Sequence, residues 1–149
     1  FNVATAERRT LPDDAETIVT FGEALPLQHW AVTDPLTVSA CGRVRMESWW
    51  LAEEQLPTNY SLLLALVDAN GETVTDSNTD LTHLATAVWE PGYHYIDARA
   101  INVPCATPPG GYPLVMSVYA PGALRSLDVV GNDGAVLGEF WYLTTVFVE

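Results

Sequence analysis

Short stretches in which apolar and polar residues alternate, separated by Gly, Pro, Asn and Asp, run through most of the chain. A long one covers Arg43–Leu51. One face of this stretch carries Val44, Met46, Ser48 and Trp50, and the other carries Arg43, Arg45, Glu47 and Trp49. A period of two residues is typical of a strand with one buried face. The pattern therefore predicts an antiparallel sheet.

The same reading predicts further strands at 17–21, 25–32, 36–40, 60–67, 72–75, 93–103, 112–119, 124–130, 135–137 and 141–148. The 60–67 run is almost wholly apolar and leads into Asn70-Gly71, which predicts a central strand that enters a hairpin, with Leu62, Leu64 and Leu66 in the core. The polar segment 76–84 is interpreted as a connection between two sheets. Elsewhere, residues 50–56 could form a short helix, which Pro57 would end.

No amphipathic helical window accompanies these strands, so the sequence predicts an all-β fold. We expect an antiparallel two-sheet β-sandwich of the immunoglobulin-like or the jelly-roll type. The length of 149 residues suits one domain. We therefore expect a single sandwich domain over 17–149, preceded by a polar lead-in or linker over 1–16.

Charge narrows the possible partners. The chain has 19 Asp and Glu against 6 basic residues, all of them Arg, for a formal charge of −13. Such a chain repels the phosphates of nucleic acid and of anionic lipids, so nucleic acid is excluded as a partner. No apolar run reaches the roughly 18 residues of a membrane helix. A chain that begins without Met is expected to be a fragment or a processed product.

Cys41 and Cys105 are the two cysteines. Their separation does not fit a zinc site, which leaves either a disulfide or two free thiols. Both lie in segments that resemble loops. A disulfide would indicate an oxidising, extracytoplasmic compartment.

An ordered set of motifs extends from Ile18 to Val148. It includes Phe21-Gly22, Leu27, Trp50 and the strand before Asn70-Gly71, and later Arg125 and the turn Asp133-Gly134. Its most specific part is Trp89-x-Pro91-Gly92-x4-Asp97-x3-Ile101-x-Val103-Pro104, then Pro109-Gly-Gly111-Tyr112-x-Leu114-x3-Val118-Tyr119-x-Pro121. In these motifs the chain resembles the C-terminal β-sandwich domain of certain bacterial multi-pass membrane glycosyltransferases. Those enzymes are similar to protein mannosyltransferases and use lipid-phosphate-linked sugars.

The resemblance implies an extracytoplasmic accessory domain, periplasmic or at the cell surface, that is tethered to a membrane protein through flanking segments. Sugar-transfer chemistry would then reside in the membrane portion of the parent protein. The motifs include no catalytic residues, so we expect this chain itself to be non-enzymatic and to need no cofactor. Its expected partners are a glycan or a protein acceptor.

Exposed aromatic rings are the most useful candidates for sugar binding, because they stack on the faces of pyranose rings. Trp49, Tyr93 and Trp141 are the first choices, and Trp30, Trp89, Tyr95 and Tyr142 are further candidates. Trp49 leads because it faces away from Val44 and Met46. Trp50 and Trp89 are expected to be packing residues.

Other chemistry has weaker support. Glu53 and Glu54 are adjacent and point to opposite sides of an extended chain, so they do not form a glycosidase pair. His29, His83 and His94 lack the context of a catalytic base. The residues Asp68, Asn70, Asp76, Asn78 and Asp80 suggest calcium, but their spacing fits turns better, so no metal is expected. Asp97 and Arg99 share one strand face and are interpreted as an internally satisfied structural pair.

The leading hypothesis is a non-catalytic extracytoplasmic module of a glycosyltransferase-like membrane protein that positions glycan or acceptor. The alternative is a stand-alone carbohydrate-binding domain. A small hydrolase with a site assembled from loops is the third hypothesis.

Overall fold

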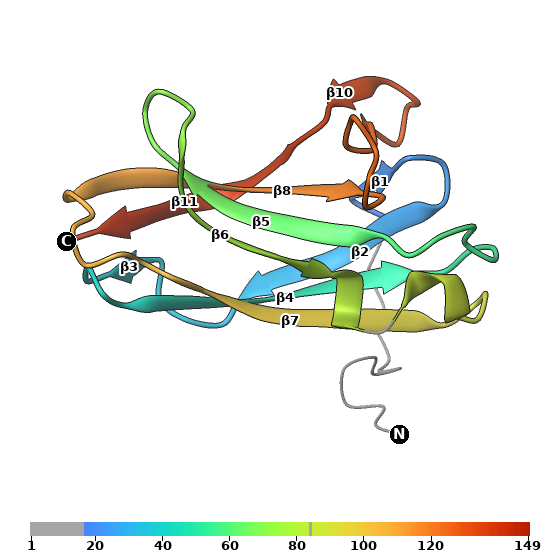
Figure 1. Ribbon diagram of the computed structural model, residues 1–149, viewed down its shortest axis with the longest axis horizontal. Coiled ribbons are helices and arrows are strands. Elements are labelled where there is room, and N and C mark those ends of the chain that lie inside the picture. The colour runs from blue at the N-terminus through green and yellow to red at the C-terminus, as the bar shows by residue number, and fades with distance from the viewer. Residues whose placement is uncertain (1–16, 84) are drawn as a thin grey trace.

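The computed structural model describes residues 17–83 and 85–149, so the lead-in predicted over 1–16 lies outside the described residues (Figure 1). Strands account for about half of the described residues, which contain no α-helix. Two single 3-10 turns, η1 (Leu81–His83) and η2 (Thr86–Val88), lie between the strands β6 (Thr73–Asp80) and β7 (His94–Asn102). The all-β prediction is confirmed, and the alternative helix over 50–56 is not adopted.

Two sheets pack face to face, as Figure 1 shows. Sheet A has the order β10 (Val136–Gly138), β9 (Val129–Val130), β1 (Val19–Phe21), β2 (Leu25–Val32), β4 (Arg43–Leu51) and β7 (His94–Asn102). Sheet B has the order β3 (Thr37–Val38), β11 (Trp141–Val148), β8 (Gly110–Tyr119), β5 (Ser61–Val67) and β6 (Thr73–Asp80). All pairings are antiparallel except that of β3 with β11.

The strand order corresponds to the immunoglobulin-like arrangement. Strands β2, β4 and β7 take the places of immunoglobulin strands A, B and E, and β5, β8 and β11 take those of C, F and G. Tyr112 supports this assignment, because it lies near the start of β8 and its hydroxyl donates to the Pro108 carbonyl at 2.6 Å. A tyrosine near the start of strand F that bonds backbone upstream is the tyrosine corner of immunoglobulin-like domains.

Two strand predictions were wrong in extent. Residues 76–80 belong to β6 instead of a connection, because this strand lies at the edge of sheet B, and edge strands carry polar side chains that discourage pairing with other chains. The predicted 124–130 strand shrinks to β9. A turn there, closed by the Ala123 amide on the Ala120 carbonyl, comes before the chain reaches sheet A.

The core fills the space between the sheets. Leu62, Leu64 and Leu66 are buried as predicted, and so are Trp50 and Trp89. The Trp50 ring lies 5.3 Å from that of Phe21, and Trp89 stacks on Tyr95 at 4.4 Å. Each large apolar side chain buried in this way contributes about 1.5–3 kcal/mol, so the contacts between the sheets stabilise the sandwich.

Cys41 and Cys105 are joined by a disulfide. It links the connection between β3 and β4 to the connection between β7 and β8, across a sequence separation of 64 residues. The Val103 amide also donates to the Gly42 carbonyl at 2.8 Å. The bridge therefore joins the two connections that run between the sheets at this end of the sandwich.

Candidate functional site

The three preferred sugar-binding residues do not form one site. Trp49 points to the outer face of sheet A, as expected, yet only 9% of it is exposed. It lies in a central strand, where the His29 ring meets it edge-on at 5.9 Å and Ile96 is its partner on β7. The expectation that Trp49 presents a free ring face is therefore wrong.

Tyr93 and Trp141 lie elsewhere. Tyr93 is 43% exposed and precedes β7 in sheet A. Trp141 opens β11 in sheet B and packs partly against the core, with its indole Nε1 buried and unpaired among the described residues. A shared sugar platform of Trp49, Tyr93 and Trp141 is not present in this fold.

Two of the exposed aromatic rings lie on the outer face of sheet B. Because Leu114, Met116 and Val118 of β8 point into the core, the alternate residues of β8 and its neighbours point outward. On β11 these are Tyr142 and Phe147, which are 55% and 52% exposed. Sequence reasoning considered Tyr142 only as a further candidate and did not single out Phe147.

Local geometry positions both rings. Phe147 lies over Gly111 of β8, where a Cβ atom would come within 3.3 Å of the ring, so the absence of a side chain makes room for it. The Tyr142 hydroxyl shares a hydrogen bond of 2.8 Å with Thr145 Oγ1. The two rings are thus held along β11 while a large part of each remains open to solvent.

Hydrogen-bond acceptors lie along the β6 edge of the same face. Asp76, Asn78 and Asp80 project outward from β6, and all three are exposed. Strand register places Tyr142 opposite Val115, Val115 opposite Ala65, and Ala65 opposite Asp76. A row across the sheet therefore begins with an aromatic ring, continues over a small apolar floor and ends with a carboxylate.

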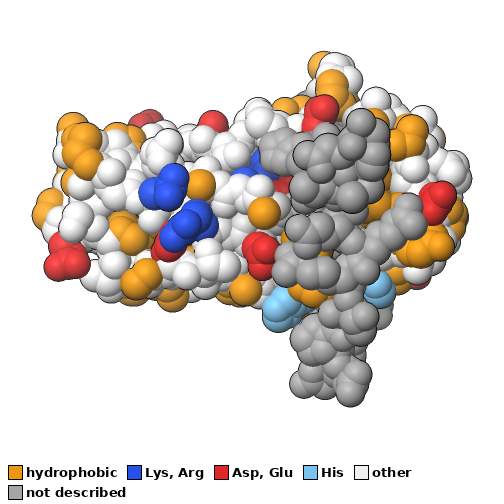
Figure 2. Space-filling view, turned by 90° about the horizontal axis from the view of Figure 1, so that it is seen from below, with side chains coloured by type: hydrophobic (Ala, Val, Ile, Leu, Met, Phe, Trp, Pro, Cys, Tyr) orange, Lys and Arg blue, Asp and Glu red, His pale blue; other side chains and the backbone are white. Residues whose placement is uncertain are grey.

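The two outer faces differ in charge. In sheet A, β4 presents Arg43 and Arg45 outward, and Figure 2 shows basic and acidic side chains on that side of the molecule. Arg45 binds Asp34 through two hydrogen bonds, and these lower the pKa of that carboxyl. The outer face of sheet B carries no basic side chain from the described residues.

Ser117 lies beneath this face. It points outward between Leu63 of β5 and the start of β11, yet it is fully buried, and its hydroxyl has no hydrogen-bond partner among the described residues. A buried polar group without a partner costs free energy. We expect Ser117→Ala to raise the free energy of unfolding by about 1 kcal/mol in urea denaturation. A loss of similar size would show that the hydroxyl is bonded.

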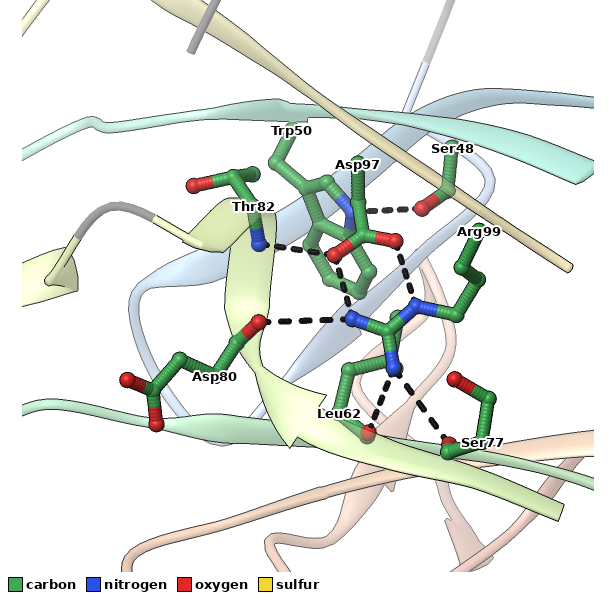
Figure 3. A network of polar contacts seen from close by, with 8 residues as sticks. All are labelled: Ser48, Trp50, Leu62, Ser77, Asp80, Thr82, Asp97 and Arg99. Carbon is green, nitrogen blue, oxygen red and sulfur yellow. Dashed lines mark hydrogen bonds and ion pairs between the residues drawn. The ribbon is translucent and has the colours of Figure 1, made fainter. Parts of the chain in front are cut away.

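The Asp97–Arg99 pair is internally satisfied, as predicted (Figure 3). Both side chains project inward from β7, and the guanidinium binds both carboxylate oxygens, at 2.6 and 2.5 Å. The Thr82 amide donates to Asp97 Oδ2 at 2.7 Å. Thr82 has a φ of 58°, which a β-branched residue rarely adopts.

Arg99 also joins the two sheets. Its Nη1 donates to the Leu62 carbonyl of β5 at 2.9 Å and to the Ser77 carbonyl of β6 at 3.3 Å. Its Nη2 reaches the Asp80 carbonyl at 3.4 Å, while the Asp80 carboxylate points away from the network (Figure 3). Because the guanidinium bonds backbone carbonyls of β5 and β6, this pair joins the two sheets where the edge strands β6 and β7 meet.

A pocket of about 270 Å³ lies at another place, between the β1–β2 turn and the segment after β4. Glu23, Glu54 and Tyr60 line it, together with apolar residues. Glu53 and Glu54 are both exposed, and the structure brings Glu54 to the same pocket as Glu23. Sequence reasoning missed Glu23, because no local pattern relates it to a residue 31 positions away.

The remaining candidates are distributed over the fold. His29 and His94 lie on sheet A, and burial lowers the pKa of His94. Asp68 accepts hydrogen bonds from the Asn70 and Glu72 amides, as a turn residue does. Across residues 17–83 and 85–149, no group of three or more His, Cys, Asp or Glu could hold a metal ion.

No family model matches the sequence, and no curated protein matches it significantly. Within the described residues, no helix is long and apolar enough to span a membrane.

Proposed function

We propose that this chain is a non-catalytic extracytoplasmic module that binds glycan on the outer face of sheet B, as an accessory part of a glycosyltransferase-like membrane protein. The observation that carries the proposal is the pair of exposed rings, Tyr142 and Phe147, on one strand, with exposed carboxylates on β6 across the same face of the sheet. Rings that stack on sugar faces and acceptors that bind hydroxyls are the two elements of a glycan site.

The disulfide supports the proposed compartment. Cys41 and Cys105 are both exposed residues, so the thiols of a reducing cytosol would reach the bridge between them and reduce it. The accessory role rests on the sequence resemblance described above. Such a module would position glycan or acceptor for chemistry carried out elsewhere in the parent protein.

A titration tests the binding site. Isothermal titration of the chain with mannotriose, galactotriose and cellotriose should give saturable binding to at least one of them. We expect Tyr142→Ala to weaken that binding about ten-fold, which corresponds to about 1.4 kcal/mol of lost stacking. Because Tyr142 is exposed and its hydroxyl bonds only locally, the melting temperature should change little.

Tyr93→Ala is the matched control, because Tyr93 is also an exposed tyrosine but lies just before β7 of sheet A. It should leave the affinity unchanged. If Tyr93→Ala weakens binding and Tyr142→Ala does not, the glycan site lies on the other side of the molecule. Absence of binding to any neutral or anionic glycan in a broad panel would refute the proposed function.

The stand-alone carbohydrate-binding domain is the second candidate, and the exposed rings favour it equally. The accessory module and the stand-alone domain differ in the protein that contains this chain, so the full reading frame decides between them. Several hydrophobic spans in the same polypeptide support the accessory module, whereas a secreted protein without them supports the stand-alone domain.

A further inference from the structure

We infer that the outer face of sheet B selects uncharged oligosaccharides and rejects those that carry carboxylate, sulfate or phosphate groups. This inference rests on the proposed function, since it names the class of glycan that the same face accepts. It follows from how charge is distributed over the four strands that make up the face.

The carboxylates of the face lie along one edge. Asp76 and Asp80 project from β6 with Asn78 between them, and all three are exposed. An anionic sugar bound across the sheet would place its charge near these groups. At about 4 Å, two like charges in water repel by an amount equivalent to about a five-fold loss of affinity.

Compensating cations are absent from this face in the described part of the chain. Arg43 and Arg45 point outward from sheet A, and Arg99 is enclosed between the sheets. Arg125 lies in the segment after β8, where its guanidinium pairs with Asp128 and Glu139. Recognition of anionic sugars depends on Arg and Lys, so the face lacks the groups that such ligands require.

The dimensions of the face favour an oligosaccharide over a single sugar. The row from Tyr142 to Asp76 crosses three strand spacings, which is about 14 Å. Between its ends the floor is formed by Val115 and Ala65, which have no hydrogen-bonding side chains. A chain of sugar residues can therefore stack on the ring at β11 and donate hydroxyl hydrogen bonds to Asp76 at β6.

The test compares one glycan in two charge states. The probes are the neutral trisaccharide that binds best and the same trisaccharide after its primary alcohols are oxidised to carboxylates. Titrated at low salt, the wild-type chain should bind the oxidised form at least about five-fold more weakly, and 0.5 M NaCl should narrow the difference by screening. The variant Asp76→Asn/Asp80→Asn keeps acceptor oxygens, and it should reduce the difference between the two affinities even at low salt.

Glu53→Gln/Glu54→Gln is the matched control, because it removes the same charge from an exposed segment outside sheet B. It should leave the ratio of the two affinities unchanged. Equal or tighter binding of the oxidised trisaccharide to the wild-type chain would overturn the inference, and so would a ratio that does not respond to the Asp76/Asp80 changes. In both cases the neutral trisaccharide still binds, so the proposed function survives. If neither form binds, the proposed function fails, and this inference fails with it.

Discussion

Replacing Asp97 by Ala should lower the free energy of unfolding by about 3–5 kcal/mol, because it leaves the Arg99 guanidinium buried without its counter-charge. For a domain of this size the melting temperature should fall by about 10 °C or more. Thermal melting followed by circular dichroism measures the change. An unchanged melting temperature would show that the pair does not stabilise the contact between the two sheets.

Two further variants keep this prediction testable if the single variant does not fold. Asp97→Leu/Arg99→Met removes both charges, so it should recover most of the lost stability, because an apolar pair of similar volume leaves no buried charge. Asp34→Ala breaks the Arg45–Asp34 pair at the surface and should have a far smaller effect, since exposed ion pairs are screened by water. If all three variants melt alike, burial is not what makes the Asp97–Arg99 pair important.

Loss of the disulfide should have the second large effect. Cys41→Ser/Cys105→Ser frees a loop of 64 residues in the unfolded chain, which on the chain-entropy model lowers stability by about 4 kcal/mol. Denaturation in urea with and without dithiothreitol measures it. The reductant should destabilise the wild-type chain to the level of the double variant and should not affect the double variant itself. Identical midpoints for all four samples would contradict the prediction.

The sequence predicted the fold well where local signals and packing agree. The strands at 25–32, 43–51 and 141–148 have the bounds that alternation gave them, because turn residues flank them and one face of each is buried. It failed where tertiary context decides. The edge strand β6 is too polar to be recognised as one, and 124–130 is apolar enough for a strand yet is mostly a loop.

The candidate site was harder to predict for a geometric reason. Alternation correctly put Trp49 on the outer face, but it says nothing of what covers that face, and His29 and Ile96 enclose the ring from the neighbouring strands. The face of Tyr142 and Asp76 combines strands that are far apart in sequence and become neighbours only through the order β11-β8-β5-β6. Asp97 and Arg99, in contrast, could be predicted as a pair from the sequence, because they lie two positions apart on one strand and therefore share a face.

The most direct test of the account is a nuclear magnetic resonance titration of the isotope-labelled chain with the neutral oligosaccharide that binds it. Amide shifts should change along β11, β8, β5 and β6, with Tyr142 and Asp76 among them, while those of the β1–β2 turn stay unchanged. Changes centred on Glu23 and Glu54 in the pocket near that turn would contradict it and would favour a site made from loops.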